Sequence, residues 1–345
     1  MSARTIIITA ISDCRRGEPI TATRPYGCLP LLNKPLLLYQ LDALAKSEGE
    51  RFIILVNGKS ESRLRELVGK TESKAKARVS FLPVEKEKEV EGAIVNATMI
   101  VPGDLLLSEV PDERQGPLLL ITKDSSEEEG AAKALLTRLG LAEKVAHLEA
   151  EASRIDYPWE LVTANQALCK GLEGQRIHPS VVREENVILE GAVAVGKGTV
   201  LKANTYIEGP VIIGEDCAIG PFAHLRPETC IADGCRIGKT EVVDSILLER
   251  VTSKHAAYLG HSVLGSEVNI GAFTVTADYR HDGKTHVTLF HGDRPEKVDT
   301  GRRKLGAFLG DRVHTAISTS IYPGRKVWPG LGTLPGEVVK EDKRL

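Results

Sequence analysis

The chain has 345 residues, of which 45 are lysine or arginine and 47 are aspartate or glutamate, so its formal net charge is −2. This length predicts two domains, each large enough to bury a core. The near-neutral charge argues against a nucleic-acid-binding protein held by bulk charge. Since no apolar run approaches the roughly 18–20 residues that cross a membrane, and no signal peptide opens the sequence, we expect a cytoplasmic protein with neither nucleic-acid nor membrane partners.

The six cysteines form no Cys-x-x-Cys pair, and no histidine and cysteine cluster has the spacing of a zinc site. We therefore expect reduced, buried thiols and no resident metal. Asparagine, glutamine and methionine are scarce, a composition that is typical of proteins from thermophiles.

The first 156 residues alternate apolar runs with helix-like segments. Apolar runs predict buried strands at residues 4–10, 51–58, 77–85 and 117–124. Residues 34–49 and 60–70 predict helices, the second with Ser60 as its N-terminal cap. Because strand–helix alternation is typical of a parallel sheet, we predict an α/β domain over residues 1–156.

Residues 157–176 predict a linking helix, after which a six-residue repeat begins. Every sixth residue from Leu189 to Val243 is aliphatic, and a fixed period of this kind marks a solenoid. Glycine often follows the aliphatic residue, as at Gly196 and Gly214, which we attribute to a corner that needs an unusual φ. The fifth position is small or β-branched, as a cramped interior requires. We therefore predict a parallel β-helix over residues 177–345.

The repeat is interrupted once by a long polar segment. Its register slips after Val243, resumes at Tyr258, and is found again from Leu309 onward. Residues 276–304 form the polar excursion between these parts. Because long loops on rigid scaffolds commonly carry function, we expect this loop to contribute to a site.

Two stretches resemble one enzyme family. Residues 29–37 (LPLLNKPLL) resemble the entry of sugar-1-phosphate nucleotidyltransferases, and residues 253–272 (SKHAAYLGHSVLGSEVNIGA) resemble an acetyltransferase centre. Together they resemble the archaeal bifunctional glucosamine-1-phosphate acetyltransferases/N-acetylglucosamine-1-phosphate uridylyltransferases. The resemblance implies a shortened Rossmann-like, nucleotidyltransferase-like domain, then a left-handed parallel β-helix of hexapeptide repeats, assembled as a homotrimer or a multiple of one.

The motifs of the first domain are degenerate. The family begins with a Gly-Gly-x-Gly-Thr-Arg loop, whose small residues let backbone N–H groups approach nucleotide phosphates. Residues 11–16 (ISDCRR) keep only Arg16 of this motif, and Asp13 adds a negative charge. Tyr26 replaces a phosphate-binding lysine, and Gly103-Asp104 precedes an apolar run where the family's magnesium motif ends one. We expect that nucleotide transfer is lost, so Mg²⁺ is required only if this domain is active.

The resemblance also implies the residues of the second site. His255 stands three residues before Tyr258, at the family's catalytic base, and an imidazole with a pKa near 6.5 suits deprotonation of an amine that attacks acetyl-CoA. The implied substrate-binding residues are Arg226, Tyr258, Asn269, Asp278 and Lys284. The implied contacts to the co-substrate acetyl-CoA are Ala272, Arg302 and Arg303. Alternatively, the two arginines and Lys304 form a solvated basic turn.

Three residues depart from the family at this site. Val243 replaces a phosphate-binding lysine, Phe273 replaces a glycine beside the CoA path, and Asp278 replaces a neutral amide. A carboxylate at position 278 repels phosphate and attracts an ammonium group. We therefore expect an altered preference among amino-sugars.

We expect an acetyl-CoA-dependent N-acetyltransferase that acts on an amino-sugar 1-phosphate. One alternative is a non-catalytic regulatory or scaffolding paralogue that partners an active sugar-phosphate nucleotidyltransferase. The gamma and epsilon subunits of the eukaryotic initiation-factor exchange complex share this architecture without sugar chemistry. A second alternative is sugar-nucleotide synthesis through an unusual phosphate loop.

Overall fold

The computed structural model describes residues 5–12, 14–45, 50–58, 60–71, 78–95, 97, 99–107, 118–121, 127–149 and 152–344. Its contacts divide the chain into two compact units. Unit 1 consists of Met1–Cys14, Arg24–Pro30 and Lys34–Asp156, and unit 2 consists of Arg15–Thr23, Leu31–Asn33 and Tyr157–Leu345. Within the described ranges, no helix has the length and apolar character needed to cross a membrane.

Unit 1 is built on a six-stranded sheet of order β5-β4-β1-β6-β8-β9, in which every neighbouring pair is parallel. The strands are β1 (Thr5–Ala10), β4 (Arg51–Val56), β5 (Val79–Pro83), β6 (Met99–Pro102), β8 (Leu118–Ile121) and β9 (Ala146–Glu149). The helices are α1 (Leu36–Leu44), α2 (Glu61–Lys70), α3 (Glu87–Val95) and α4 (Glu127–Arg138). This strand order is that of a Rossmann-like fold, as the sequence predicted.

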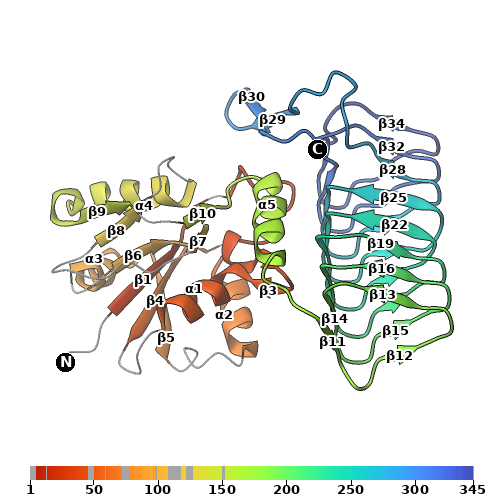
Figure 1. The fold of residues 1–345 in the computed structure, drawn as a ribbon. Helices are drawn as coiled ribbons and strands as arrows, with labels where there is room; N and C mark the ends of the chain where they lie inside the picture. Colours follow the sequence, from red (N-terminus) through yellow and green to blue (C-terminus); the bar gives the residue numbers. More distant parts are fainter. Residues whose placement is uncertain are drawn as a thin grey trace. The chain divides into compact units, whose positions relative to one another are not determined.

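Helices cover both faces of this sheet (Figure 1). Ile6 and Ile8 of β1 pack in one core with α1 and α2, whereas Ile7 packs in a second core with α3 and α4. Successive residues of a strand point to opposite faces, so a continuous apolar run such as that of β1 can fill two cores at once.

Short elements complete unit 1 and its borders. Strands β7 (Leu105–Leu107) and β10 (Ala152–Arg154) pair antiparallel. The others are β2 (Pro30–Leu31), β3 (Lys34–Pro35) and the 3₁₀ turns η1 (Tyr26–Cys28) and η3 (Ala142–Lys144).

Ser60 stands at the predicted N-cap position of α2, but without the capping hydrogen bond. Its hydroxyl donates instead to the carbonyl of Ala10, 2.8 Å away, at the end of β1. The Asn57 side chain accepts the backbone N–H of Ser60 at 3.0 Å. The end of β1 therefore takes the serine proton, and the serine oxygen accepts the backbone N–H of Asn57 at 3.3 Å.

Unit 2 is a left-handed parallel β-helix with three sheets (Figure 1). Its first sheet contains β11 (Gln175–Ile177), β14 (Val193–Val195), β17 (Val211–Ile213), β20 (Thr229–Ile231), β23 (Ile246–Leu247), β26 (Val263–Leu264), β31 (Phe308–Leu309) and β33 (Lys326–Val327). Its second sheet contains β12 (Val182–Arg183), β15 (Val200–Leu201), β18 (Ala218–Ile219), β21 (Arg236–Ile237), β24 (Thr252–Ser253) and β27 (Asn269–Ile270). Its third sheet contains β13 (Ile188–Glu190), β16 (Tyr206–Glu208), β19 (His224–Leu225), β22 (Thr240–Val243), β25 (Ala257–Gly260), β28 (Val275–Thr276), β32 (Ser320–Ile321) and β34 (Val338–Val339).

The coils shorten in the middle of the β-helix. Strands β14 and β17 pair residues 18 positions apart, such as Val193 and Val211, which corresponds to three hexapeptides. Strands β22 and β25 pair residues 17 apart, such as Val242 and Leu259. Three corners lack one residue each: those between Ile237 and Val242, between Val242 and Leu247, and between Leu259 and Leu264.

This shortening corrects two positions of the predicted repeat. Val242 and Leu259 are fully buried, whereas Val243 and Tyr258 lie half-buried beside them. The register therefore slips before Val243, and it resumes at Leu259. As a consequence the Tyr258 side chain is turned outward.

Crowding between coils, and not φ, explains most of the repeat glycines. Only Gly220 among Gly196, Gly214, Gly220 and Gly238 has a positive φ. A Cβ on Gly196 would lie 2.6 Å from the carbonyl carbon of Gly214 in the next coil. The small fifth residues are buried as predicted, including Thr199, Thr205, Cys217 and Cys235. All six cysteines are free thiols, five of them buried.

Two further elements complete unit 2. Helix α5 (Pro158–Cys169) falls within residues 157–176. The excursion at residues 276–304 contains an antiparallel hairpin of β29 (Val287–His291) and β30 (Pro295–Asp299). Lys326 is buried beneath this hairpin and donates to the Leu289 carbonyl at 2.6 Å.

Truncation of a buried repeat position should destabilise unit 2. We expect Ile219→Ala to lower the free energy of unfolding by about 2–5 kcal/mol, because it leaves a cavity in a rigid interior. Urea denaturation measures this change. Ile317→Ala is the matched control, since Ile317 is 57% exposed, and equal effects of the two variants would contradict the assignment of the core.

Candidate functional site

The outer face of the third sheet carries a row of four side chains, three of which have polar groups. His224, Glu241, Tyr258 and Val275 stand in register on β19, β22, β25 and β28. All four line a groove of about 380 Å³, which Phe222 and Phe273 border. One backbone register thus places an imidazole, a carboxylate and a phenol side by side.

The corner that leads into this sheet holds the predicted base. His255 and Ala272 occupy the same corner of successive coils, and the His255 side chain is exposed. Phe273 also lies there, with a φ of 62° and with 64% of its surface exposed. Since glycine is the residue that adopts such a φ without strain, the backbone keeps the shape of a glycine corner. The aromatic ring of Phe273 borders the groove.

Tyr258, which lines the groove, is paired with Asp278. The Tyr258 hydroxyl donates to Oδ2 of Asp278 at 2.8 Å. Burial and this hydrogen bond raise the pKa of Tyr258 well above its ordinary value. Burial alone would raise the pKa of Asp278, but hydrogen bonds from His261 and Tyr258 outweigh it and lower that pKa. The pair is therefore a neutral phenol and an ionised carboxylate.

Arg226 is the predicted phosphate ligand nearest to this pair. Its Nη1 lies 2.9 Å from Oε1 of Glu241, and both side chains are about two-fifths exposed. Arg226 and Glu241 both act electrostatically on Tyr258. The structure therefore brings Arg226, Tyr258 and Asp278 together.

Other predicted residues lie elsewhere on unit 2. Asn269 faces outward from the second sheet, on β27, and not from the sheet of Tyr258. Lys284 and Arg303 are exposed in the excursion. The backbone N–H of Lys284 donates to Asp282 at 3.2 Å.

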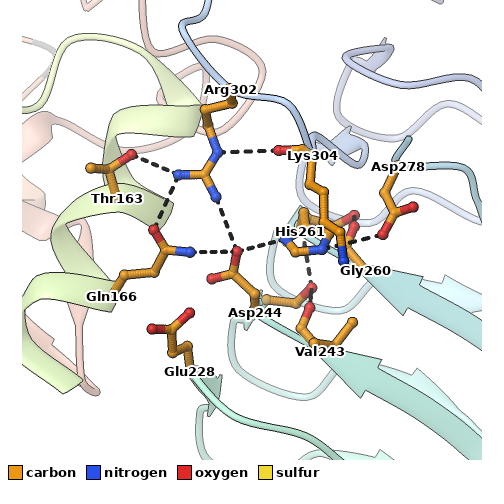
Figure 2. A network of polar contacts seen from close by, with 12 residues as sticks. Thr163, Gln166, Glu228, Val243, Asp244, Gly260, His261, Asp278, Arg302 and Lys304 are labelled. Carbon is orange, nitrogen blue, oxygen red and sulfur yellow. Dashed lines mark hydrogen bonds and ion pairs between the residues drawn. The ribbon is translucent and has the colours of Figure 1, made fainter. Parts of the chain in front are cut away.

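Arg302 is engaged within unit 2 (Figure 2). Its guanidinium donates to Thr163 of α5 at 2.8 Å and to Asp244 at 3.0 Å. A longer contact of 3.3 Å reaches the Lys304 carbonyl. The contact of Arg302 with acetyl-CoA stays a prediction. Acetyl-CoA has to compete with these partners for the guanidinium.

Sequence reasoning missed a histidine between two aspartates (Figure 2). Nδ1 of His261 lies 2.6 Å from Oδ2 of Asp244, and Nε2 lies 3.2 Å from Oδ2 of Asp278. Burial alone would lower the pKa of His261, but the hydrogen bonds to Asp244 and Asp278 raise it above 6.5. We call Asp244, His261 and Asp278 the corner ladder.

A signal for the corner ladder was present in the sequence. The three residues are spaced 17 apart, which is the length of one shortened coil in this region. A strict period of six hides this relation, because it assigns 18 residues to every coil.

The degenerate motifs of unit 1 surround a buried carboxylate. Oε1 and Oε2 of Glu128 accept the backbone N–H groups of Ile11 and Ser12 at 2.6 and 3.0 Å. These amides follow β1, where a phosphate loop would begin. Glu128 is only 1% exposed, and burial raises its pKa.

The remaining motif positions of unit 1 are core residues. Tyr26 is buried, and its hydroxyl donates to the Asp156 carbonyl at 2.9 Å. Asp104 is fully buried, and desolvation and the Asp156 carboxyl raise its pKa well above the ordinary value. Asp13 lies outside the described residues. Arg16 belongs to unit 2, where it lies 5.8 Å from the centre of the Tyr157 ring.

Metal ligation finds no support in the part of the chain that the structure describes. No group of three or more histidine, cysteine, aspartate or glutamate side chains there is arranged to hold a metal ion.

Four of the matches to known proteins describe what this chain is similar to. The family model "GMPPB C-terminal domain" matches residues 207–323. A "Bifunctional protein GlmU" from Methanococcus maripaludis strain C7 is 48% identical over 174 residues, which are 50% of this chain and 41% of that protein. This chain thus matches less than half of the length of that relative. "Translation initiation factor eIF2B subunit gamma" from Dictyostelium discoideum is 36% identical over 74 residues, which are 20% of this chain and 17% of that one.

The fourth match extends over both units. A "Bifunctional sugar-1-phosphate nucleotidylyltransferase/acetyltransferase" from Sulfurisphaera tokodaii is 30% identical, and the alignment covers 97% of each chain. Because the similarity runs through nearly the whole of both sequences, this chain belongs to the family of bifunctional sugar-1-phosphate nucleotidylyltransferases/acetyltransferases.

Proposed function

We propose that unit 2 transfers an acetyl group from acetyl-CoA to the amine of an amino-sugar 1-phosphate, and that unit 1 no longer transfers nucleotides. The observation that carries the first part is the groove on the third sheet: Tyr258 lines it and donates to Asp278, Glu241 lines it and pairs with Arg226, and the exposed His255 directly precedes its lining residues Ala256 and Ala257. The acetyltransferase named among the relatives supports the same reaction.

Each side chain of the groove has a defined task in this proposal. Acetyl-CoA supplies the acetyl group as a thioester. His255 accepts the proton that the acceptor amine loses as its nitrogen bonds to the acetyl carbon, and the thioester C–S bond breaks to release CoA as its thiolate. Arg226 offers its guanidinium to the sugar phosphate, in competition with Glu241. Lys284 and Arg303 remain candidates for phosphate contacts from the excursion.

The departures from the family change the charge of the groove. Val243 offers no cation to a phosphate, and Asp278 adds a carboxylate to that of Glu241. These residues favour an acceptor whose amine is close to the carboxylates and whose phosphate is held by fewer groups. We therefore propose weaker dependence on the 1-phosphate than a lysine at position 243 would give.

The geometry of unit 1 supports loss of nucleotide transfer. A nucleotide phosphate at the end of β1 needs the backbone amides of Ile11 and Ser12, and the Glu128 carboxylate already accepts both. An anionic ligand at that place would have to displace a buried carboxylate. Residues Arg15–Thr23, the rest of the loop segment, pack within unit 2.

We also propose a homotrimer or a multiple of one. Tyr258 and Asn269 face outward from two different sheets of one β-helix. A site that uses both side chains therefore needs Asn269 from a second copy of the chain.

Removal of the proposed base should stop acetyl transfer. We expect His255→Ala to lower kcat at least about 100-fold, because general base catalysis contributes on the order of 10²–10⁴. Free CoA release from acetyl-CoA, with glucosamine 1-phosphate and other amino-sugars as acceptors, measures the rate. His178→Ala is the control, since His178 is also exposed but lies before the first complete coil. Unchanged turnover in the His255 variant would refute the assignment.

The same assay distinguishes acetyl transfer from the second candidate function. The match to an initiation-factor subunit favours a non-catalytic paralogue that partners an active sugar-phosphate nucleotidyltransferase. Absence of turnover with every acceptor, together with absence of acetyl-CoA binding in calorimetry, would favour this alternative over the enzyme.

Unit 1 should form no sugar nucleotide. With N-acetylglucosamine 1-phosphate, UTP and Mg²⁺, we expect no pyrophosphate release above a protein-free blank, because Glu128 occupies the amides that a phosphate needs. A coupled phosphate assay detects the product. Sustained, enzyme-dependent release would support the remaining alternative, nucleotide transfer through an unusual loop.

The trimer has a simple physical test. One chain has a mass of 37.4 kDa, so light scattering should report about three times this mass or a multiple of it. Full acetyltransferase activity at the mass of a single chain would show that no second copy is needed.

A further inference from the structure

The corner ladder connects the interior of unit 2 with the groove. Its first member, Asp244, is only 2% exposed, and Oδ2 of this residue accepts from His261, Gln166 and Arg302 at 2.6, 2.7 and 3.0 Å. Its last member, Asp278, reaches the groove through Tyr258. His261, which is 7% exposed, is the only side chain that contacts both aspartate carboxylates in the polar contacts that the structure describes.

The two carboxylates beside its ring favour a doubly protonated His261. A neutral imidazole has one N–H donor and one acceptor nitrogen. Each ring nitrogen here faces an ionised or buried carboxylate oxygen, so a neutral ring would set a nitrogen lone pair against one of them. The imidazolium hydrogen-bonds to Asp244 through Nδ1, and its Nε2 forms a 3.2 Å ion pair with Asp278 that lacks the geometry of a hydrogen bond. The raised pKa of His261 agrees with this arrangement.

The ladder also closes the neck of the excursion. Asp278 stands at its start, and the Asp278 carbonyl accepts the backbone N–H of Leu305 at 2.9 Å, just beyond its end. Arg302, near the end, donates to Asp244. The Asp278 backbone is therefore anchored by Leu305, while the Asp278 carboxylate contacts His261.

Other charged or titratable groups surround the ladder. Lys304 acts on Asp278, Glu228 lies close to Asp244, and Cys169 of α5 lies beyond them. His286 approaches the backbone carbonyl of Asp278 at 3.1 Å. Among the described residues, only His261 contacts both carboxylates of the ladder.

The consequence for the groove follows from the single proton of a phenol. Tyr258 donates that proton to Asp278, which as a carboxylate can only accept. The Tyr258 oxygen is then left with its lone pairs. A phenol without this partner could instead donate to a substrate oxygen, so the ladder decides the polarity of the hydrogen bond that Tyr258 offers.

We propose that His261 is a positioning residue for acceptor recognition: held between Asp244 and Asp278, it fixes the Asp278 carboxylate so that Tyr258 presents its oxygen to the groove as an acceptor for an N–H or O–H group of the amino-sugar. The inference rests on the proposed acetyltransferase function. It assigns Tyr258 to recognition of a hydrogen-bond donor, and it assigns no contact with substrate to His261.

The proposal predicts a pH dependence of acceptor binding. The folded-state pKa of His261 is raised, so the ladder is intact below that pKa and loses one donor as the pH rises through it. The 3.2 Å contact to Asp278 is the longer one and is expected to be lost first. The KM for the acceptor should then increase on the alkaline side, while the KM for acetyl-CoA stays constant.

Asp244→Asn tests the positioning role without touching the groove. Removal of one carboxylate lowers the pKa of His261, so the alkaline rise in acceptor KM should begin at lower pH than in the wild type. The acceptor amine titrates identically with both proteins, and its own ionisation cancels in the comparison. Tyr258→Phe is the second variant, and it should raise the acceptor KM tenfold to a hundredfold at every pH.

His178→Gln serves as the control, and thermal unfolding establishes that each variant is folded. The proposal would be supported if the alkaline rise in acceptor KM began at lower pH in Asp244→Asn and if the acceptor KM were raised in Tyr258→Phe. Acetyl transfer with the pH limb and the acceptor KM unchanged in both variants would overturn it and leave the proposed function intact. Absence of acetyl transfer in the wild type would overturn the proposed function and this inference with it.

Discussion

Backbone hydrogen bonds between successive coils hold the β-helix together, and the positions of nearly all functional side chains in unit 2 depend on them. Because strands of adjacent coils pair in parallel register, residues one coil apart stand next to one another on the same face or corner. The row of His224, Glu241 and Tyr258 is a direct result. So is the corner ladder, where the same corner in three coils places a histidine between two aspartates.

Burial makes this ladder a demanding arrangement. An isolated buried charge is costly, and a buried pair that loses one partner leaves the other uncompensated. Asp244 therefore gathers three donors on one oxygen, and a cation separates the two aspartates. The energetic requirement for pairing links α5, the neck of the excursion and the groove, since each supplies a partner to the same small set of charges.

Unit 1 follows the opposite route at the end of β1. Where a glycine-rich loop would leave backbone amides for a phosphate, the amides of Ile11 and Ser12 are satisfied by Glu128. A Rossmann-like sheet can thus keep its strand order and both helical layers while an internal carboxylate takes up its anion-binding groups. The fold and the anion-binding groups depend on different residues, so the fold persists when the anion-binding groups change.

The sequence by itself determined the α/β character of the first unit, the β-helix, and most of the buried repeat positions, because side-chain periodicity and core packing are local and repetitive. It also singled out Tyr258 and Asp278 by resemblance. Only the tertiary structure decided that Val242 and Leu259 fill the interior, that Ser60 bonds to Ala10, and that Glu128 reaches Ile11, since loop lengths and partners distant in sequence set these contacts. The two aspartate partners of His261 could not be predicted from the hexapeptide repeat. They lie beside it because the coils here have 17 residues, whereas three hexapeptides have 18.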